Sequence, residues 1–362
     1  MKRFLLLASL ALATTGCGSD DADPPASSTP APVPTPTPSP SPTPSPSPTP
    51  TPSASIPLTG NVAPAHDPAI LFDNGTYYLF TTGNNGDAEG LLALRTSTNL
   101  TDWTLRGGSY TAIPAWAKAA VPDTGGMWAP DIIKVGNQYR LYYSISAFGK
   151  NNSAIGLATA DVIDPAAPAA NWQDQGAVVQ SSTSDDYNAI DPMVFTNGGK
   201  RMWMAFGSFW TGIKVIELDP ATGKRLARDP APRALASRPF PGAIEAPYVV
   251  RRGGFYYLFA SFESCCQGVN STYYTVVGRS EAPLGPYVDR DGKAMLDGGG
   301  TVVLTNGQDD GSRFVGRGHV SVIQREGTHY IVYHAYDRQQ NGFPNLQIQR
   351  LDWDADGWPV AR

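Results

Sequence analysis

The feature that most constrains this chain is a strand–turn–strand unit that occurs five times between His66 and Tyr333. Each unit has a short apolar run, in four cases around a Pro, then a turn containing Gly, then a run rich in aromatic and β-branched residues. The units begin at His66, Trp128, Ile190, Glu245 and Gly318. This pattern predicts two paired strands joined by a tight turn.

Each unit leaves room for two further strands before the next one begins. Candidates for the next strand are Leu91–Ser97, Ala154–Thr159, Gly212–Leu218 and Tyr274–Ser280. Four short strands in each of five units, with almost no helical periodicity, predict an all-β fold, a five-bladed β-propeller. A two-domain β-sandwich is the alternative, but it would not explain why the repeats keep register.

The register predicts which side chains meet, because the first strand of every propeller blade lines the central axis. The units align on Pro68, Pro130, Pro192, Pro247 and Val320. The position before these holds Asp67, Ala129, Asp191, Ala246 and His319, and the position before that holds His66, Trp128, Ile190, Glu245 and Gly318. Three carboxylates should therefore converge at one mouth of the channel. A purely structural propeller has no reason to gather them, because like charges at short range raise the energy.

Two carboxylates facing each other across a cleft suit an inverting glycosidase, where one activates water and the other protonates the leaving oxygen. Glu245 begins an apolar strand, which would raise its pKa and suit it to donate a proton. A third carboxylate nearby would raise that pKa further. The flat faces of Trp128, Phe148 and Trp210 suit the C–H faces of sugars, although core packing is the common use of any one aromatic.

A series of motifs carries a family resemblance across residues 58–362. In order they read HDP, MWAPDI, YYSISAFG, NAIDP, FGSFW, AIEAPYV, SFESCCQGVNSTY, VGRS, GPY, GRGHVSVI and LDWDADGWPV. Their order is similar to that of the endo-acting arabinanases of glycoside hydrolase family 43. The resemblance implies a five-bladed propeller and inverting cleavage of α-1,5-linked arabinofuranose chains, as found in the side chains of plant pectin.

The resemblance also implies roles for residues at matching motifs. Asp67 would be the general base, Asp191 the modulator of the acid, and Glu245 the general acid. From the resemblance, the residues expected to line the substrate cleft are Gly149, Asn188, Ala189, Ile190, Ser208, Phe209 and Trp210. The aromatic residues Trp128 and Phe148 are expected there for the reason given above. His319 matches a residue associated with an axial ion, usually calcium. Its own chemistry also fits a hydrogen-bonded channel residue, because calcium prefers oxygen ligands.

Two rival functions remain open at this point. An exo-acting arabinofuranosidase or β-xylosidase could use the same propeller, with loops that close one end of the cleft. A non-catalytic glycan-binding propeller would bind oligosaccharides without hydrolysis, but it does not explain three acids together. Among the remaining histidines, His66 is expected to position the base or touch substrate, whereas His329 and His334 are interpreted as structural.

The N-terminal part of the chain is expected to lie outside the catalytic domain. Residues 1–17 have a basic start, an apolar run and small residues before Cys17, which predicts a signal peptide. Gly16-Cys17 resembles a bacterial lipobox, but Thr14 replaces the usual aliphatic residue, so release without a lipid anchor is the alternative. Residues 18–57, nearly all Pro, Thr, Ser and Ala from Pro24 onward, predict a stiff polyproline-type linker.

The formal net charge of −5 argues against nucleic acid or an anionic membrane as a partner. The expected partner is a polysaccharide, with membrane contact only through a lipid at Cys17, and the expected form is a monomer. Cys265-Cys266 would form either a vicinal disulfide or a pair of packed thiols. Asp352–Gly357 copies the start of an EF-hand loop but lacks its final Glu, so a hairpin turn is expected there.

Overall fold

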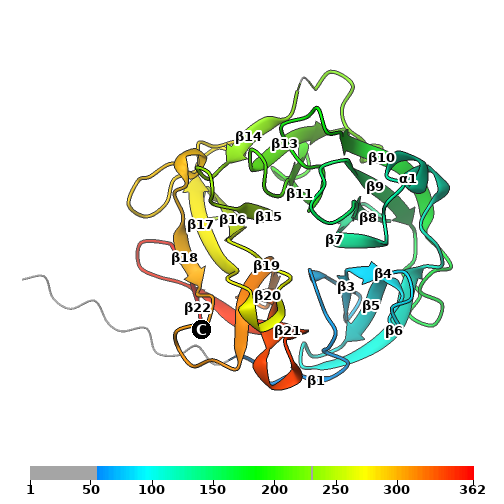
Figure 1. The fold of residues 1–362 in the computed structure, drawn as a ribbon, viewed down its shortest axis with the longest axis horizontal. Coiled ribbons are helices and arrows are strands. Elements are labelled where there is room, and N and C mark those ends of the chain that lie inside the picture. The colour runs from blue at the N-terminus through cyan, green and yellow to red at the C-terminus, as the bar shows by residue number, and fades with distance from the viewer. Residues whose placement is uncertain (1–54, 230) are drawn as a thin grey trace, which may run out of the picture. The chain divides into compact units, whose positions relative to one another are not determined.

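The computed structural model describes residues 55–229 and 231–362, so the signal peptide and most of the linker predicted above lie outside the described residues. The described chain forms five separate, mainly antiparallel sheets around a common centre (Figure 1). The five-bladed propeller is therefore confirmed and the β-sandwich is excluded. In the described part no helix is long and apolar enough to cross a membrane.

The first two blades each have an additional short strand. Blade 1 contains β1 (Thr59–Gly60), β2 (Ala69–Asp73), β3 (Thr76–Thr81), β5 (Leu91–Ser97) and β6 (Asp102–Tyr110). Blade 2 contains β4 (Gly83–Asn84), β7 (Gly126–Val135), β8 (Gln138–Ile145), β9 (Ser153–Ala160) and β10 (Gln173–Ser181). The helix α1 (Ala115–Ala120) lies between the two blades in the chain.

The last three blades each have four strands in sequence order. Blade 3 contains β11 (Met193–Thr196), β12 (Met202–Phe206), β13 (Ile213–Leu218) and β14 (Arg233–Ala236). Blade 4 contains β15 (Ile244–Arg252), β16 (Phe255–Phe262), β17 (Tyr274–Ser280) and β18 (Thr301–Leu304). Blade 5 contains β19 (Phe314–Arg325), β20 (Thr328–Asp337), β21 (Phe343–Trp353) and β22 (Pro359–Ala361). Short 3₁₀ turns are η1 (Gly268–Asn270), η2 (Met295–Asp297) and η3 (Arg338–Gln340).

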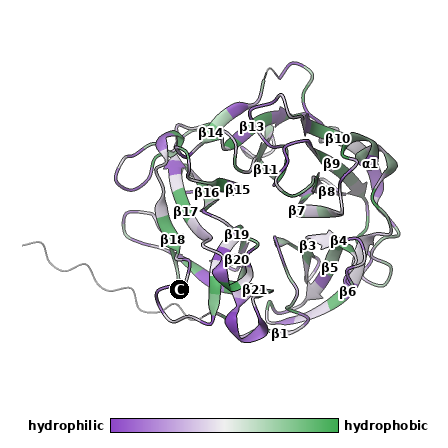
Figure 2. Ribbon diagram, viewed as in Figure 1, coloured by the Kyte–Doolittle hydropathy of each residue, from purple (hydrophilic) through white to green (hydrophobic). Residues whose placement is uncertain are grey.

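Apolar side chains on both faces of each blade hold the ring together. The described part has five apolar clusters, and each contains residues from two neighbouring blades. Figure 2 shows hydrophobic residues concentrated in the strands and hydrophilic residues in the connecting loops. The central strands of each blade are therefore apolar on both sides, which is why they show so little alternation between apolar and polar residues.

The ring is closed where the start of the propeller meets its last blade. The N–H of Ile56 donates to Ile348 O over 2.9 Å, and the N–H of Leu346 donates to Val62 O over 2.9 Å. Strand β1 pairs in parallel with β6 of blade 1. The chain thus contacts blade 5 ahead of residue 58, the expected start of the catalytic domain, and links it to blade 1.

One backbone conformation occurs at the same place in all five blades. The residues immediately before the aligned positions all have positive φ: Asp67 (53°), Ala129 (43°), Asp191 (59°), Ala246 (54°) and His319 (53°). The ladders of β7, β15 and β19 shift register at this point, as at a β-bulge. A non-glycine residue with positive φ costs on the order of 1–3 kcal/mol, so the surrounding structure must hold it there.

Candidate active site

The polar residue that ends the second strand of a blade holds the bulged residue of the next blade. The backbone N–H groups of Ala129, Asp191, His319 and Asp67 donate to Thr82 Oγ1, Ser144 Oγ, Ser261 Oγ and His334 Nδ1, respectively. These distances are 2.8–3.1 Å. This repeated hydrogen bond explains how the fold maintains four of the five strained residues around its axis.

Between blade 3 and blade 4 this hydrogen bond is replaced by others, and these involve two of the predicted acids. Gly207 follows β12 and has no side chain to offer. The N–H of Ala246 instead donates to Asp191 Oδ2 over 3.1 Å. Ser208, the next residue, donates from Oγ to Glu245 Oε2 over 2.6 Å. Where blade 3 departs from the repeat, Asp191 therefore takes the place of the missing hydroxyl, and Ser208 binds Glu245.

Asp67 lies in a cage of imidazoles and one hydroxyl. His66 Nδ1 is 2.8 Å from Asp67 Oδ2, and His319 Nδ1 is 2.9 Å from Asp67 Oδ1. The Thr82 hydroxyl donates to Oδ2 over 2.6 Å. His334 Nδ1 accepts from the Asp67 N–H, as described above, and its ring stacks on that of His66 with centroids 3.8 Å apart.

These partners determine the protonation of Asp67. Burial alone would raise the pKa of Asp67, but His66 and His319 together lower that pKa well below its usual value. Burial likewise opposes the charge on His319, yet its pairing with Asp67, with Asp191 and Glu245 nearby, raises the pKa of His319 to about 9. Asp67 is thus a carboxylate paired with an imidazolium at neutral pH.

The two other carboxyls lie in surroundings of the opposite kind. Burial raises the pKa of Asp191 well above its usual value, and the nearby Glu245 and Asp67 add to this rise while His319 opposes it. Burial also raises the pKa of Glu245, against the opposing effect of the Ser208 and Tyr273 hydroxyls. Asp191 and Glu245 therefore retain a proton between them at a pH where ordinary carboxyls are ionised.

The other residues predicted from the sequence are placed as follows. Phe209 and Trp210 are 43% and 44% exposed, and the Phe209 N–H donates to Ile244 O beside Glu245. Asn188 and Ala189 are buried, and Asn188 accepts from Ser153 Oγ. Ile190 is half-buried. Residues 188–190 directly precede Asp191 in the chain, and residues 208–210 lie beside Glu245.

On the second blade, the predicted residues lie in two places. Trp128 is half-buried and donates from Nε1 to Asn84 Oδ1 over 2.9 Å. Phe148, 81% exposed, and Gly149 lie in the loop after β8, the strand whose Ser144 holds Asp191. Core packing, the alternative use of an aromatic, is therefore excluded for Phe148.

Two side chains near the His66–Asp67 pair were not assigned to the site from the sequence. His334, interpreted there as structural, accepts from the Asp67 N–H, the same backbone contact that serine and threonine hydroxyls make in other blades. Tyr336 is the other, because its hydroxyl lies 2.7 Å from His66 Nε2. The signal for His334 was its position at the end of a second strand, where Thr82, Ser144 and Ser261 are also polar. His329 packs edge-on against Trp353 and is not among the Asp67 contacts.

The structure also shows the conformation of the cysteine pair and of the EF-hand-like segment. Cys265 and Cys266 form a disulfide, which decides between the two alternatives for the pair. The EF-hand-like segment is the turn between β21 and β22. Asp354 Oδ1 accepts there from the N–H groups of Asp356 and Trp358, as in a tight turn.

The surroundings of His319 do not fit calcium well. Its Nδ1 faces Asp67, which leaves one ring nitrogen, and calcium prefers several oxygen ligands. Among the described residues, the sets of three metal-binding groups close enough to share an ion are His66–Asp67–His334 and His66–Cys265–Cys266, and neither includes His319. The calcium ion stays a prediction.

One carboxyl with a lowered pKa and two with raised pKa values in one site suit a glycoside hydrolase, which needs a base and an acid together. Comparison with known proteins gives the family. The model described as "Glycosyl hydrolases family 43" matches residues 62–359. The chain belongs to glycosyl hydrolase family 43.

The relatives named in these comparisons include both endo-acting and exo-acting enzymes. An extracellular endo-α-(1→5)-L-arabinanase of Bacillus subtilis is 41% identical over 81% of this chain and 86% of its own. An extracellular exo-α-(1→5)-L-arabinofuranosidase of Cellvibrio japonicus is 37% identical over 84% of this chain and 88% of its own. The solved structure of a Cellvibrio cellulosa α-L-arabinanase with arabinohexaose is 36% identical, with a TM-score of 0.76, 82% of this chain covered and 95% of that one.

Proposed function

We propose that this protein is an endo-acting arabinanase that cleaves internal α-1,5 bonds of arabinan with inversion. The observation that carries the proposal is the opposite displacement of pKa within one constellation, low for Asp67 and high for Asp191 and Glu245. A general base must be ionised and a general acid protonated at the working pH. The names of the related enzymes, and the arabinohexaose complex of one of them, support arabinan as the substrate.

The proposed step uses one water molecule. Asp67 accepts a proton from the water as its oxygen attacks the anomeric carbon. The bond from this carbon to the leaving oxygen breaks, and Glu245 donates its proton to that oxygen. The His319 imidazolium keeps Asp67 ionised before attack. Asp191 raises the proton affinity of Glu245, because two buried carboxylates side by side repel each other.

The test separates the two roles by means of the leaving group. Asp67→Ala and Glu245→Ala should both lose activity on linear arabinan, by about a thousandfold or more. An aryl arabino-oligosaccharide whose leaving phenol has a low pKa needs no proton from the enzyme. Glu245→Ala should therefore keep much of its rate on that substrate, while Asp67→Ala should not. Retained activity of either variant on arabinan would overturn the assignment.

The mode of action is tested by products. An endo enzyme releases a range of oligosaccharides early from linear arabinan, whereas an exo enzyme releases one short product from the start. The relative from Cellvibrio japonicus makes exo action the second candidate. Nuclear magnetic resonance of the first product should show inversion at the anomeric carbon. Tight binding without any hydrolysis would support the non-catalytic alternative.

We propose in addition that the chain is exported and anchored through a lipid on Cys17. The leader at residues 1–17 supports export, as do the two relatives that are named extracellular. Residues 1–54 lie outside the described part, so this proposal depends on sequence alone. Cys17→Ala should move the protein from the membrane fraction to the soluble exported fraction, and an unchanged distribution would contradict the anchor.

A further inference from the structure

The loop after β16 runs from the proposed acid to the proposed base. It leaves the sheet beside Glu245, which pairs with Ser261 near the end of β16. Further along, the N–H of Cys266 donates to Tyr336 Oη over 2.8 Å. That hydroxyl contacts His66, which contacts Asp67. Cys265 and Cys266 therefore lie on the path that joins the two halves of the site.

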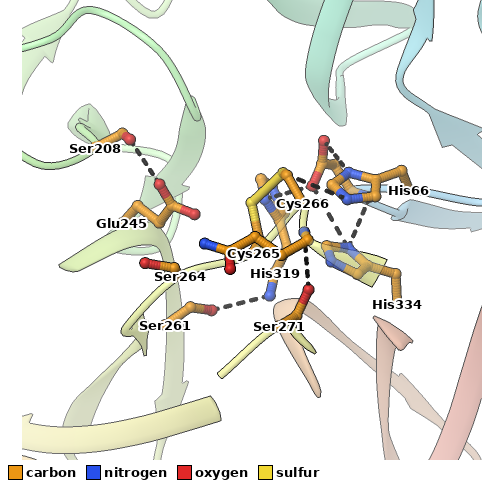
Figure 3. The surroundings of a disulfide bond; sticks show 12 residues. His66, Ser208, Glu245, Ser261, Ser264, Cys265, Cys266, Ser271, His319 and His334 are labelled. Atoms are coloured by element: carbon orange, nitrogen blue, oxygen red, sulfur yellow. Dashed lines mark hydrogen bonds and ion pairs between the residues drawn. A yellow bond between two sulfur atoms is a disulfide. The ribbon is translucent and has the colours of Figure 1, made fainter. Parts of the chain in front are cut away.

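The disulfide faces the site and is accessible. Cys266 is exposed and Cys265 is half-buried. Cys266 Sγ lies 3.9 Å from His66 Nε2. In the view of Figure 3 the two sulfurs stand between Glu245 on one side and His66 on the other. An oxidised sulfur pair carries no charge and donates no hydrogen bond, so it is a polarisable apolar surface within a site of charged and polar groups.

The loop that carries the disulfide is held by hydrogen bonds on the C-terminal side of the two cysteines. Gln308 Nε2 donates to Val269 O over 2.8 Å and to Ser271 O over 2.9 Å. The Gln267 N–H donates to Ser271 Oγ over 3.0 Å. The disulfide also joins adjacent residues, so the two sulfurs cannot move independently. The apolar surface is thus rigid and is presented to the site by hydrogen bonds that do not involve sulfur.

We propose that the Cys265–Cys266 disulfide is a substrate-binding surface that packs under the C–H face of the arabinofuranose ring lying between Asp67 and Glu245. This inference rests on the proposed function. A sugar ring has an apolar face as well as hydroxyl edges, and binding sites cover that face with apolar groups. The sulfurs suit this apolar face because they do not compete with polar side chains for hydrogen bonds to the sugar hydroxyls.

A binding surface and a purely structural bond have different kinetic consequences. A flat apolar contact holds substrate and transition state about equally, so its loss raises KM and leaves kcat nearly unchanged. A bond needed only to position Tyr336 and His66 would act through Asp67. Its loss would lower kcat and shift the pH dependence. The Tyr336 contact uses the backbone N–H of Cys266, which remains when the sulfurs are removed.

The experiment begins with the state of the two cysteines in the full-length protein. Alkylation without reduction, followed by mass spectrometry, should leave the peptide containing Cys265 and Cys266 unmodified. Free thiols in the purified protein would overturn the proposal. Binding of linear arabinohexaose is then measured by calorimetry in the inactive Glu245→Gln protein, with and without Cys265→Ala and Cys266→Ala. Affinity should fall about tenfold, as expected for the loss of one apolar ring contact.

The same two substitutions are made in the active protein to separate binding from chemistry. KM for linear arabino-oligosaccharides should rise about tenfold and kcat should change less than about threefold. A lower kcat with unchanged KM, or a shifted pH profile, would overturn the proposal in favour of a positioning role. If the double variant does not fold, phosphine reduction of the native protein should weaken binding, and reoxidation should restore it.

Gln308→Ala is the matched control, because it removes the anchor of the loop and leaves the sulfurs in place. Its affinity should fall clearly less than that of the double cysteine variant, because the sulfurs and the Gln267–Ser271 hydrogen bond both remain. An equal loss in Gln308→Ala and in the double cysteine variant would show that loop order, not the sulfur surface, is responsible. If the wild-type protein does not cleave arabinan, the proposed function fails. If it does and the double variant binds equally well, only the disulfide proposal fails.

Discussion

Asp67 and Glu245 lie at nearly equivalent points of two blades, yet their surroundings have opposite effects. Asp67 is contacted by His66, His319 and Thr82, all of which favour the carboxylate. Glu245 is buried beside Asp191, and its hydrogen-bond partner there is the Ser208 hydroxyl. The five-fold repeat brings acidic side chains to the axis, and the groups contributed by the neighbouring blades then decide which one is ionised. The backbone repeat thus places the carboxyls, and the different neighbours of each carboxyl determine its charge.

The loss of the base should have the largest effect. Asp67→Asn keeps the shape of the side chain but cannot accept a proton, so kcat/KM on linear arabinan should fall by about ten thousandfold. Asp131→Asn is the matched control. Asp131 is also a buried carboxyl on an inner strand, accepts from the Val194 N–H over 2.8 Å, and burial raises its pKa to about 7. An amide there should change kcat/KM less than about threefold, and an equal loss in both variants would contradict a special role for Asp67.

The next effect is on the acid. Asp191→Asn removes a negative charge that repels the Glu245 carboxylate, so the pKa of the acid should fall. The basic limb of the kcat/KM profile should then move to lower pH, and the maximal rate should drop by about a hundredfold. The pH profile of kcat/KM checks this. A limb that stays in place or moves to higher pH would show that Asp191 does not tune the acid.

His319→Gln tests the control of the pKa of the base, Asp67, through the pH profile of kcat/KM. His319 lowers the pKa of Asp67, so its loss should raise that pKa and move the acidic limb of kcat/KM to higher pH. Near neutral pH, kcat/KM of this variant should fall by about tenfold to thirtyfold. His329→Gln, a substitution away from Asp67, should leave the limb unchanged. An acidic limb that is the same in His319→Gln and the wild-type protein would contradict the pairing.

Replacing Asp67 and replacing Asp191 should change the stability of the fold in opposite directions. Asp67 has a lowered pKa in the fold, so its stabilisation is present above its unfolded pKa and is lost as pH falls through the folded one. Asp191 has a raised pKa, so the fold is less stable once pH rises through its unfolded pKa towards the folded one. At neutral pH, Asp67→Asn should lower Tm and Asp191→Asn should raise it, each by roughly 2–4 °C. Differential scanning fluorimetry would detect this, and shifts of the same sign would contradict the asymmetry.

Much of this arrangement could be predicted from the sequence, because the register of a repeated strand fixes its side chains. Asp67, Asp191 and Glu245 were found in that way. His334 and Tyr336 were not, because they belong to a second strand and contact Asp67 and His66, respectively, only across the boundary between blades. The positive φ of Ala129 and Ala246 also has no local signal, because alanine, unlike Asp and His, is not enriched in that region. The disulfide remained undecided until the loop geometry was known.

Neutron diffraction at about pH 6 tests the central claim most directly, because it locates the protons on all three carboxyls at once. The account predicts no proton on Asp67, two nitrogen-bound protons on His319, and at least one proton shared by Asp191 and Glu245. A proton on Asp67, or a fully ionised Asp191–Glu245 pair, would contradict it.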